Sequence, residues 1–597
     1  MITRKSTDAL PLDHEQETRK FEWSLLKRLL AYLKPHGKSM IVMYLMALLN
    51  VGATLAIPIV LKIGIDDHVA AGNAEGLPLI AAILVGLIIV LYFSARSQGM
   101  LVMKIGYRVL YYLRRDLFTH LQSLSFRYFD SQRTGRIMSR LTNDVQVLEQ
   151  LLRAGLDTIL VDIVMLIGIT VAMVSLDARM SVILFVTVPL FTTLVFVLRA
   201  RIVRAGRRIQ RKLASVNAFL NESISGIKVI RAFAREKENG ENFSAVNDEY
   251  YTEARSFYPL IAFFWQGVST LSTIGTALVL LAGGLLLSRG LVTIGIIAAF
   301  LSYINRFFQP MQKLSNMINQ LSRAMASAER IFELLDTETE ICDAPDAKAD
   351  VTLRGAVSFR EVWFAYEGDE FVLENVSFDV KPGETVAFVG ATGAGKTTMI
   401  NLLCRFYDPV RGRIEVDGHE LRTLQQSAYR SQIALVMQDA RIFSGSILEN
   451  IRFGKPDATL EEVCAVAQRI GIEPMINAMP DGYDTEIGER GSSLSLGQRQ
   501  LIAFARALLR DPTILVLDEA SAYLDSSTEG LVQEGMRRIS KDRTTFVIAH
   551  RLATIRDADR IIVVNHGRIV ESGSHAELVA EDGHYAELLR NQYAVVA

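Results

Sequence analysis

The chain has 597 residues, too many for a single hydrophobic core, so at least two domains are expected. Half of the residues are hydrophobic and 22% are charged, which argues against an ordinary soluble protein but requires that part of the chain face water. The formal net charge of -1 gives no indication of a nucleic-acid partner.

The N-terminal residues 1–20 are polar and mixed in charge, and they lack the order of a cleaved signal peptide. We therefore predict a tail over 1–20. The segment Phe21–Leu33 mixes apolar and basic residues, which is typical either of a helix lying on the inner leaflet or of a solvated start to the first membrane span. Both readings stay open.

Six apolar stretches before about residue 315 are long enough to cross a bilayer, which needs roughly 20 apolar residues. They could instead be buried helices of a large soluble core, but several are apolar on every side. The predicted spans are Ser39–Ile65, Leu77–Ser94, Leu156–Leu176, Met180–Leu198, Phe257–Ser288 and Leu291–Phe308.

The links between these spans predict their orientation. The link after the first span is acidic, whereas the links after the second and fourth are long and basic, which places them in the cytoplasm with both termini. Their basic residues are Arg108, Arg114, Arg115, Arg133, Arg136, Arg140, Arg204, Arg207, Arg208, Arg211 and Lys212.

Both long links keep apolar residues at helical spacing, so the membrane helices should continue into the cytoplasm. Gly135 and Gly226 are expected to interrupt the helices where the chain reverses. Asp144 and Arg140 either brace the first link or lie on a solvated helix face.

Two charged residues fall inside predicted spans, where charge is costly and often functional. We hypothesise that Asp162 and Arg306 face a substrate cavity, where pairing with each other, within or between subunits, is one option. Separate residues that extend toward cytoplasmic water are the alternative.

The second half reads as a soluble α/β domain. Residues 336–350 are acidic and contain proline, so we predict a linker there. The three cysteines, Cys342, Cys404 and Cys464, have no CxxC spacing, which argues against disulfides or a zinc site and fits a reducing cytoplasm.

A phosphate-binding loop follows the apolar strand Thr385–Val389 and precedes a helix-like run. Its glycines let backbone N–H groups converge on phosphates at a helix N-terminus, while Lys396 adds a positive charge and Thr397 a hydroxyl for Mg²⁺. The predicted nucleotide-binding residues here are Gly390, Ala391, Thr392, Gly393, Ala394, Gly395, Lys396, Thr397 and Thr398.

A second signal is the run Ile514–Glu519, an apolar strand that ends in two carboxylates. Asp518 is expected to hold Mg²⁺, and Glu519 to polarise the attacking water. Alone, this run could be a strand with a solvated acidic end.

Between these two signals lies SLSLGQRQLIAFARALL, and there the sequence resembles the ABC transporter superfamily, specifically bacterial multidrug and lipid exporters that fuse both domains in one chain. The resemblance covers the chain from about Phe21 onward. It implies a multi-domain fold: an α-helical membrane domain with six transmembrane helices over 21–335, the linker, and an α/β P-loop ABC ATPase domain over 351–597.

The resemblance also implies roles for single residues. Tyr366 would stack on adenine, Gln438 would sense Mg²⁺ and the γ-phosphate, and His550 would bridge Glu519 to the γ-phosphate. Two residues are expected at subunit contacts, Glu486 in the exporter-specific loop and Asp525 after the catalytic carboxylate.

The ABC signature departs from the family pattern. Ser495, Gly497 and Gln498 are kept and would reach the other subunit's nucleotide, but Leu496 replaces a glycine. This is either harmless drift in a homodimer or the altered signature of one subunit in a heterodimer. Both stay open.

The implied function is ATP-driven export of a hydrophobic or amphipathic drug, lipid or peptide across the cytoplasmic membrane by a dimer, with ATP and Mg²⁺ as cofactors. ATP closes the two ATPase domains by binding the closed pair better. The loop reversals near Phe126–Arg136 and Phe219–Val229 would dock in those domains. An importer with the same fold and an ATP-gated channel are the alternatives; the predicted spans exclude a soluble ABC protein.

Overall fold

The computed structural model describes residues 23–488, 491, 493–518, 526–549 and 552–593. The predicted tail 1–20 lies outside them. The chain forms two compact units, and each is described by itself. Unit 1 holds Met1–Leu121 and Gly135–Asp336, and unit 2 holds Gln122–Thr134 and Thr337–Ala597.

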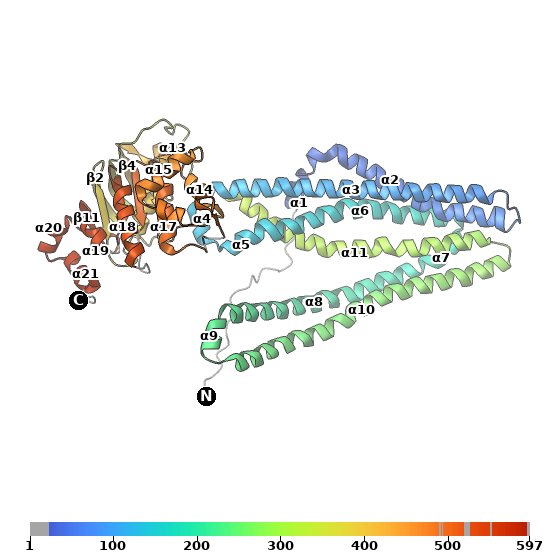
Figure 1. The fold of residues 1–597 in the computed structure, drawn as a ribbon. Helices are drawn as coiled ribbons and strands as arrows, with labels where there is room; N and C mark the ends of the chain where they lie inside the picture. Colours follow the sequence, from blue (N-terminus) through green and yellow to red (C-terminus); the bar gives the residue numbers. More distant parts are fainter. Residues whose placement is uncertain (1–22, 489–490, 492, 519–525, 550–551, 594–597) are drawn as a thin grey trace. The chain divides into compact units, whose positions relative to one another are not determined.

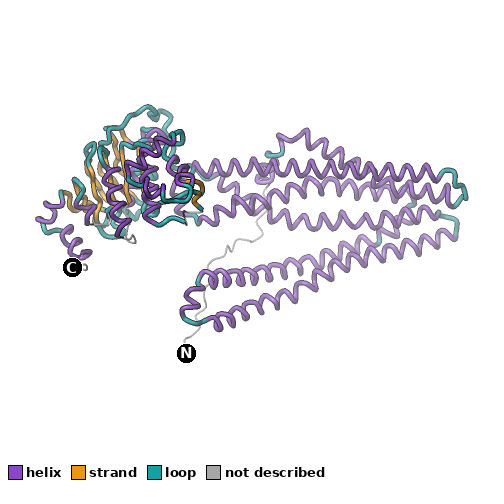
Figure 2. The backbone as a smooth tube through the Cα atoms, in the orientation of Figure 1, coloured by secondary structure: helices purple, strands orange, loops and turns teal. Residues whose placement is uncertain are grey.

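The described part of unit 1 is built from helices (Figures 1 and 2). In chain order they are α1 Trp23–Ala31, η1 Lys34–His36, α2 Gly37–Ile63, η2 Gly64–Val69, α3 Leu77–Ser123, α5 Thr134–Ser139, η3 Arg140–Asp144, α6 Val145–Leu176, α7 Ala178–Phe185, α8 Thr187–Ser225, α9 Ile227–Ala232, α10 Glu236–Ser288 and α11 Ile294–Asp336.

Five of the predicted spans fall in these helices, and the sixth does so from Ile294 onward. Four of the described segments are long and apolar enough to cross a membrane, namely Lys34–Val69, Leu77–Ser123, Thr134–Leu176 and Glu236–Ser288. The predicted fourth span lies in α7 and α8, and the sixth lies in α11.

Several helices are much longer than a bilayer requires. α3 has 47 residues and α10 has 53, so they extend about 70 and 80 Å, against a hydrocarbon thickness of about 30 Å. The predicted continuation of the membrane helices beyond the bilayer is therefore observed.

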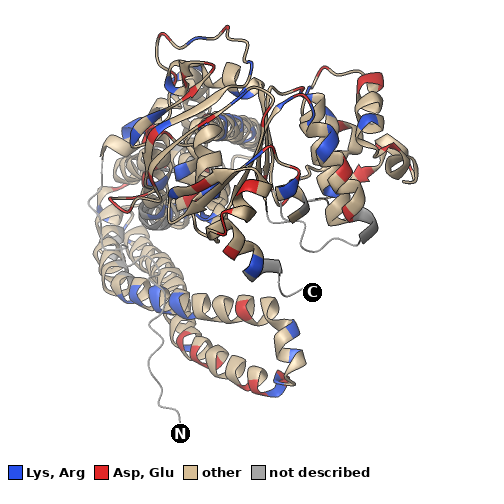
Figure 3. Cartoon of the chain, turned by 90° about the vertical axis from the view of Figure 1, so that its left-hand side faces the viewer, with Lys and Arg blue, Asp and Glu red and all other residues tan. Residues whose placement is uncertain are grey.

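Helices α8 and α10 lie side by side and are joined by the short helix α9 (Figure 1). Basic residues of α8 face acidic residues of α10: Arg208 pairs with Glu253 at 2.9 Å and Lys212 with Glu249 at 2.6 Å (Figure 3). Gly226 separates α8 from α9, as predicted. This hairpin therefore holds itself together by charge outside its apolar length.

A buried cluster joins α6, α7, α8, α10 and α11, and it includes Met173, Phe191, Val279 and Phe300. The hydroxyl of Tyr303 donates to the carbonyl of Leu55 at 2.6 Å, which ties α11 to α2. Burying a polar group in this way requires such a partner.

Asp144 braces η3 against α11. Its carboxylate is 6% exposed and accepts hydrogen bonds from the Ser327 hydroxyl at 2.8 Å and from Arg330 Nε at 2.9 Å. Arg140 pairs with Glu333 at 3.2 Å. The bracing interpretation of Asp144 and Arg140 is the one that the structure supports. Gly135, by contrast, lies inside α5 and does not interrupt a helix.

Asp162 on α6 is buried, but its ion-pair partner is not the expected one. Its carboxylate lies 3.5 Å from Lys313 on α11, and among the described residues no ion pair joins it to Arg306. A pair between Asp162 and Arg306 is therefore not observed within the described part of the chain, and the ion pair of Asp162 is with Lys313, seven residues further along α11; that Asp162 and Arg306 face a cavity stays a prediction.

Unit 2 contains two main sheets and the short helix α4 Phe126–Ser131, although α4 lies between membrane helices in the sequence. The antiparallel sheet has the order β2-β1-β4-β5, and the larger sheet has the order β12-β11-β3-β10-β9-β6. The strands are β1 Val357–Phe364, β2 Leu373–Val380, β3 Thr385–Val389, β4 Arg411–Val416, β5 His419–Glu420, β6 Ile433–Val436, β7 Gly445–Ser446, β8 Glu486–Ile487, β9 Ile514–Asp518, β10 Thr544–Ile548, β11 Arg560–Asn565 and β12 Arg568–Gly573.

The parallel strands of the larger sheet are covered on both faces, which explains why they are largely apolar, whereas the edge strand β12 is partly exposed and polar. Along β3, Val386 and Phe388 enter one buried cluster and Ala387 and Val389 enter the other. The helices of this unit are α12 Lys396–Leu403, α13 Gln426–Ser431, α14 Ile447–Arg452, α15 Leu460–Ile470, α16 Glu473–Asn477, α17 Leu496–Leu509, α18 Ser526–Ser540, α19 Leu552–Arg556, α20 His575–Ala580 and α21 His584–Tyr593, with 3-10 turns η4 Leu421–Thr423 and η5 Gly482–Asp484.

Candidate active site

Four neighbouring parallel strands, β6, β9, β10 and β3, end at the same edge of the larger sheet. The phosphate-binding loop follows β3, Asp518 ends β9, and Gln438 follows β6. Because ligands of open α/β sheets bind at the carboxyl ends of the strands, this topology gathers predicted residues that are far apart in sequence.

The phosphate-binding loop needs glycine at its last turn. Gly395 has φ +106° and directly precedes α12, and a Cβ there would lie 2.7 Å from the Leu373 side chain. A Cβ on Gly390 would lie 2.1 Å from the carbonyl oxygen of Val564. The loop is therefore folded tightly against the sheet, and α12 begins with free first-turn amides directed at the loop.

Lys396 is held inside this loop. It is 6% exposed, and its ammonium group donates to the carbonyl oxygens of Gly390 at 2.8 Å and Ala391 at 2.9 Å. Burial lowers the pKa of Lys396, while the negative charge of Asp518 acts in the opposite direction. The ammonium group thus lies inside the loop, near enough to the carboxylate at the end of β9 for that charge to act on it.

The two threonines that follow differ. Thr397 is exposed, so its hydroxyl is open to a ligand. Thr398 is buried, and its hydroxyl lies 3.1 Å from the hydroxyl of Tyr366. Asn401 also donates to the Tyr366 hydroxyl, at 3.4 Å. The half-buried ring of Tyr366 is therefore fixed by its hydroxyl to the helix of the phosphate-binding loop.

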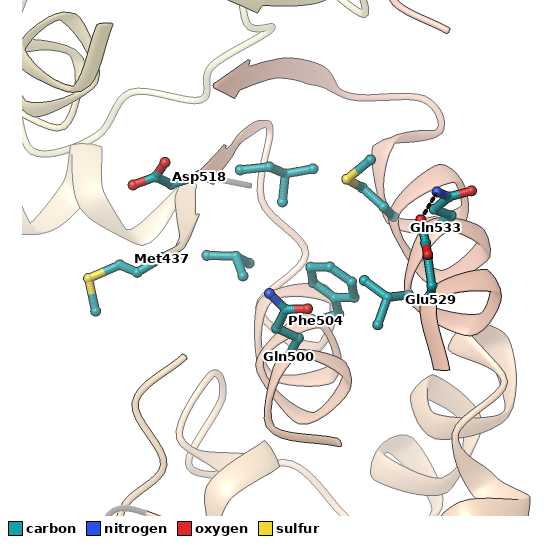
Figure 4. Close-up of a pocket in the computed structure, with 10 residues that line it drawn as sticks. Met437, Gln500, Phe504, Asp518, Glu529 and Gln533 are labelled. Atoms are coloured by element: carbon teal, nitrogen blue, oxygen red, sulfur yellow. Dashed lines mark hydrogen bonds between the residues drawn. The ribbon is translucent and has the colours of Figure 1, made fainter. Parts of the chain in front are cut away.

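A pocket lies beside Asp518, lined by β9, α17, α18 and the segment after β6 (Figure 4). Asp518 and Met437 line one side, and Gln533 donates to Glu529 at 3.2 Å on the other. Gln438, next to Met437, is exposed. The predicted metal ligands Thr397 and Gln438 are thus exposed, while Asp518 is half-buried.

Two predicted catalytic residues, Glu519 and His550, lie outside the described residues, and so does Asp525. In the sequence, Glu519 comes immediately after β9, and His550 comes two residues after the end of β10. Their roles stay predictions.

The signature forms the start of α17. Ser495 is the N-cap residue: its hydroxyl accepts from the Gln498 amide at 3.2 Å, and the Gln498 side chain accepts from the Ser495 amide at 2.8 Å. Gly497 is buried, and Leu496 is the first helical residue, half-buried. This capping box stabilises the helix start with leucine in place of glycine. Among the described residues, no hydrogen bond joins the signature to the phosphate-binding loop.

Three further residues contact the site and were not predicted. Asn401 and Tyr407 contact Tyr366. Gln500 is 5% exposed and lines the pocket beside Asp518. Gln500 lies only two residues after Gln498, but nothing in the sequence alone distinguishes these side chains from ordinary core residues.

Glu486 lies on the short strand β8, which pairs with β7. Nearby in sequence to β7, the exposed rings of Phe443 and Phe453 stack at 4.7 Å, and the guanidinium of Arg506 lies 5.3–5.4 Å from both ring centroids. Burial lowers the pKa of Arg506 to about 10.

Comparison with known families gives two matches. Residues 40–311 match the ABC transporter transmembrane region, and residues 373–522 match the ABC transporter family, which describes the ATPase part.

Relatives match over nearly the whole chain. The ABC transporter ATP-binding protein YknV of Bacillus subtilis is 41% identical, covering 96% of this chain and 95% of its own length. The putative multidrug export ATP-binding/permease protein YgaD of the same organism is 37% identical over 95% of this chain and 99% of its own.

A solved structure agrees in fold. A bacterial Atm1-family ABC exporter with ATP bound superposes with a TM-score of 0.76 at 29% identity, covering 96% of this chain and all of the other. The arrangement of one membrane region and one ATPase region in a single chain is therefore shared.

Proposed function

The chain belongs to the ABC transporter family as a half-transporter that fuses the membrane and ATPase regions, and we propose that it exports hydrophobic or amphipathic compounds as one half of a dimer. Its ATPase region hydrolyses ATP, and its membrane region makes it a multi-pass membrane protein. Relatives described as putative multidrug exporters support drugs as one substrate class.

One observation carries the proposal. Lys396 lies inside a tightly turned glycine loop at the start of α12, within the electrostatic influence of Asp518, in the same chain as four helices that are long and apolar enough to span a membrane. The loop provides the charge and amides that bind phosphates, so binding energy from ATP becomes available to a membrane region.

The residues present also fit Mg²⁺. Hard cations take oxygen ligands, and the Thr397 hydroxyl, the Asp518 carboxylate and the Gln438 amide are of this kind. When bound, Mg²⁺ would neutralise charge on the phosphates. We propose that Thr397, Asp518 and Gln438 hold the ion, that Glu519 polarises the attacking water, and that His550 positions Glu519.

A dimer is required because one ATPase region covers a nucleotide on one side only. We propose that Ser495, Gly497 and Gln498 of each subunit complete the other subunit's site. The intact capping box at Ser495 supports a working signature despite Leu496, because a helical first position does not need glycine. We therefore favour pairing of two identical chains.

The basic links support a cytoplasmic location for the ATPase region and both termini. We propose that α9 docks on the ATPase region of the partner subunit. Its support is an apolar surface on and around α9 that includes Ile227, Val229 and Phe233, the last 74% exposed. In unit 2, α4 already packs on the ATPase fold.

Transport by the purified chain in inside-out vesicles tests the proposal. We expect the vesicles to take up a fluorescent hydrophobic dye when Mg²⁺ and ATP are present. We expect no uptake by the Lys396→Ala variant, because the phosphates of ATP lose the positive charge that binds them. Accumulation in right-side-out vesicles only would identify an importer. Ion conductance in planar bilayers without dye uptake would identify a channel. Either result would contradict export.

A further inference from the structure

Helix α4 is held on the ATPase fold by consecutive residues that follow α12. The ring of Phe406 stacks on Phe126 with centroids 4.1 Å apart, and the hydroxyl of Tyr407 donates to the Asp130 carboxylate. Arg405, the residue before them, has φ +52° and is 2% exposed, and it donates to the Leu424 carbonyl at 2.7 Å. This buried arginine fixes the backbone from which Phe406 and Tyr407 project.

Tyr407 also reaches the opposite way, toward the candidate site. Its ring contacts the ring of Tyr366 edge-on, with centroids 5.1 Å apart and planes at 90°. Both rings contact Phe364, at 5.5 and 4.9 Å. Tyr407 is 3% exposed, so it cannot turn to water without repacking. A shift of Tyr366 is therefore passed to Tyr407 by direct contact.

The proton of Tyr407 is fixed by its surroundings. Burial and the nearby charge of Asp130 raise the pKa of Tyr407 above its usual range, against a smaller opposing effect of Arg127. The hydroxyl therefore stays protonated and acts as the donor to Asp130. Hydrogen bonds to a charged group are strong and directional. A small movement of the Tyr407 ring therefore changes the strength of the hydrogen bond that holds α4.

Under the proposed function, Tyr366 is the residue on which the base of a bound nucleotide would stack. Its hydroxyl is tied to Thr398 and Asn401 of α12, and its ring contacts the rings of Tyr407 and Phe364. A base that stacks on the exposed part of the Tyr366 ring would press on the ring from the solvent side. A displacement of the ring would act on Tyr407 directly and through Phe364, which contacts both tyrosines, and from Tyr407 it would reach Asp130.

We propose that Tyr407 is a positioning residue that reports occupancy of the nucleotide base at Tyr366 to helix α4 through its hydrogen bond to Asp130. The proposal rests on the proposed function, because it needs the base at Tyr366. The base and the phosphates then have separate roles. The phosphate-binding loop holds the nucleotide by its phosphates, and Tyr366 and Tyr407 couple the base to α4.

Hydrogen–deuterium exchange on the full chain tests this, in a Glu519→Gln background so that ATP stays bound. We compare α4 with residues 390–398, with and without ATP. We expect ATP to slow exchange in both segments, in α4 by about tenfold, the size of one hydrogen bond to a charged group. In the Tyr407→Phe variant, ATP should slow exchange at residues 390–398 as much as in the parent, but it should slow exchange in α4 by less than about threefold.

Tyr585→Phe is the matched control. Tyr585 is also buried and its hydroxyl lies 2.7 Å from His575 Nδ1, so this variant loses an equivalent contact away from α4. We expect it to behave as the parent. Phe406 still stacks on Phe126 in Tyr407→Phe, which keeps α4 docked.

A second arm changes the base. Cytidine triphosphate carries the same phosphates on a smaller ring, so at saturation it should slow exchange at 390–398 but slow α4 less than ATP does. Equal slowing of α4 by both nucleotides overturns the proposal. The proposal is also overturned if Tyr407→Phe speeds the exchange of α4 by the same factor with and without ATP. In that case Tyr407 would only hold α4 in place and would not respond to the nucleotide. If ATP does not slow exchange at residues 390–398 of the parent, the chain does not bind the nucleotide, and the proposed function itself fails.

Discussion

At the scale of single residues, the phosphate-binding loop predicts the sharpest effect. Gly395→Ala places a methyl group against Leu373 at a φ that favours glycine, a strain of about 1–3 kcal/mol. We expect ATP hydrolysis to fall at least about tenfold, measured as phosphate release. Gly383→Ala is the control, because Gly383 also has positive φ but open space around it. Equal loss in both variants would mean that backbone strain anywhere in the domain is enough.

The signature gives a second test at this scale. Leu496 begins α17 with its N-cap hydrogen bonds intact, so we expect the purified chain to pair with itself and hydrolyse ATP. Leu496→Gly should then change the rate by no more than about twofold, the range of a tolerated substitution. An inactive monomer that gains activity only with another half-transporter would show that the chain needs a different partner.

The catalytic carboxylate gives a third. We expect Glu519→Gln to bind ATP with unchanged affinity and to turn over at least tenfold slower, because the side chain can no longer polarise the water. Nucleotide affinity from fluorescence titration and turnover from phosphate release separate the two. Normal turnover would remove Glu519 from the role proposed for it.

At the scale of elements, the sequence was sufficient where the pattern is local. The phosphate-binding loop, the strand before Asp518 and the long apolar helices all carry a periodicity or a motif that physics ties to one conformation. The partner of Asp162 was not predictable, because Lys313 is seven residues from the expected Arg306 and one helix face holds both. The contacts of Tyr407 with α4 join segments almost 280 residues apart, and no local pattern encodes such a contact.

The brace between η3 and α11 predicts a stability effect. Asp144→Asn leaves Ser327 and Arg330 without a charged acceptor, and we expect the free energy of unfolding to fall by about 1–2 kcal/mol. Glu333→Gln, at an exposed carboxylate that pairs with the largely buried Arg140, should change it by less than about 0.5 kcal/mol. Thermal unfolding in detergent compares the two, and similar losses would mean that Asp144 does not brace α11.

Helix α9 predicts an effect on coupling rather than on stability. Phe233→Ser removes an exposed apolar contact, so we expect unchanged melting but loss of dye transport relative to ATP hydrolysis. Tyr251→Ser, on the exposed surface of α10, should leave the ratio of transport to hydrolysis unchanged. A normal ratio in Phe233→Ser would exclude this surface as the docking site.

At the scale of the whole molecule, the proposed function places the nucleotides between two subunits. In a dimer, two phosphate-binding loops and two signatures predict two nucleotides held at the subunit interface. The chain needs both regions, because the membrane helices lack a source of energy and the ATPase region lacks a path across the bilayer. What the exporter carries is set by the membrane region, whose apolar character gives a class of compound and not a single one.

The placement of α4 has a consequence for biosynthesis. Residues 122–134 leave the ribosome early, yet Phe406 and Tyr407, which hold α4, follow almost 280 residues later. At roughly 5–20 residues per second, α4 waits about a quarter of a minute to a minute before its seat exists. During that interval Phe126 has nothing to stack on, so a nascent chain that stalls before the ATPase region is complete carries an exposed aromatic loop that chaperones and proteases can recognise.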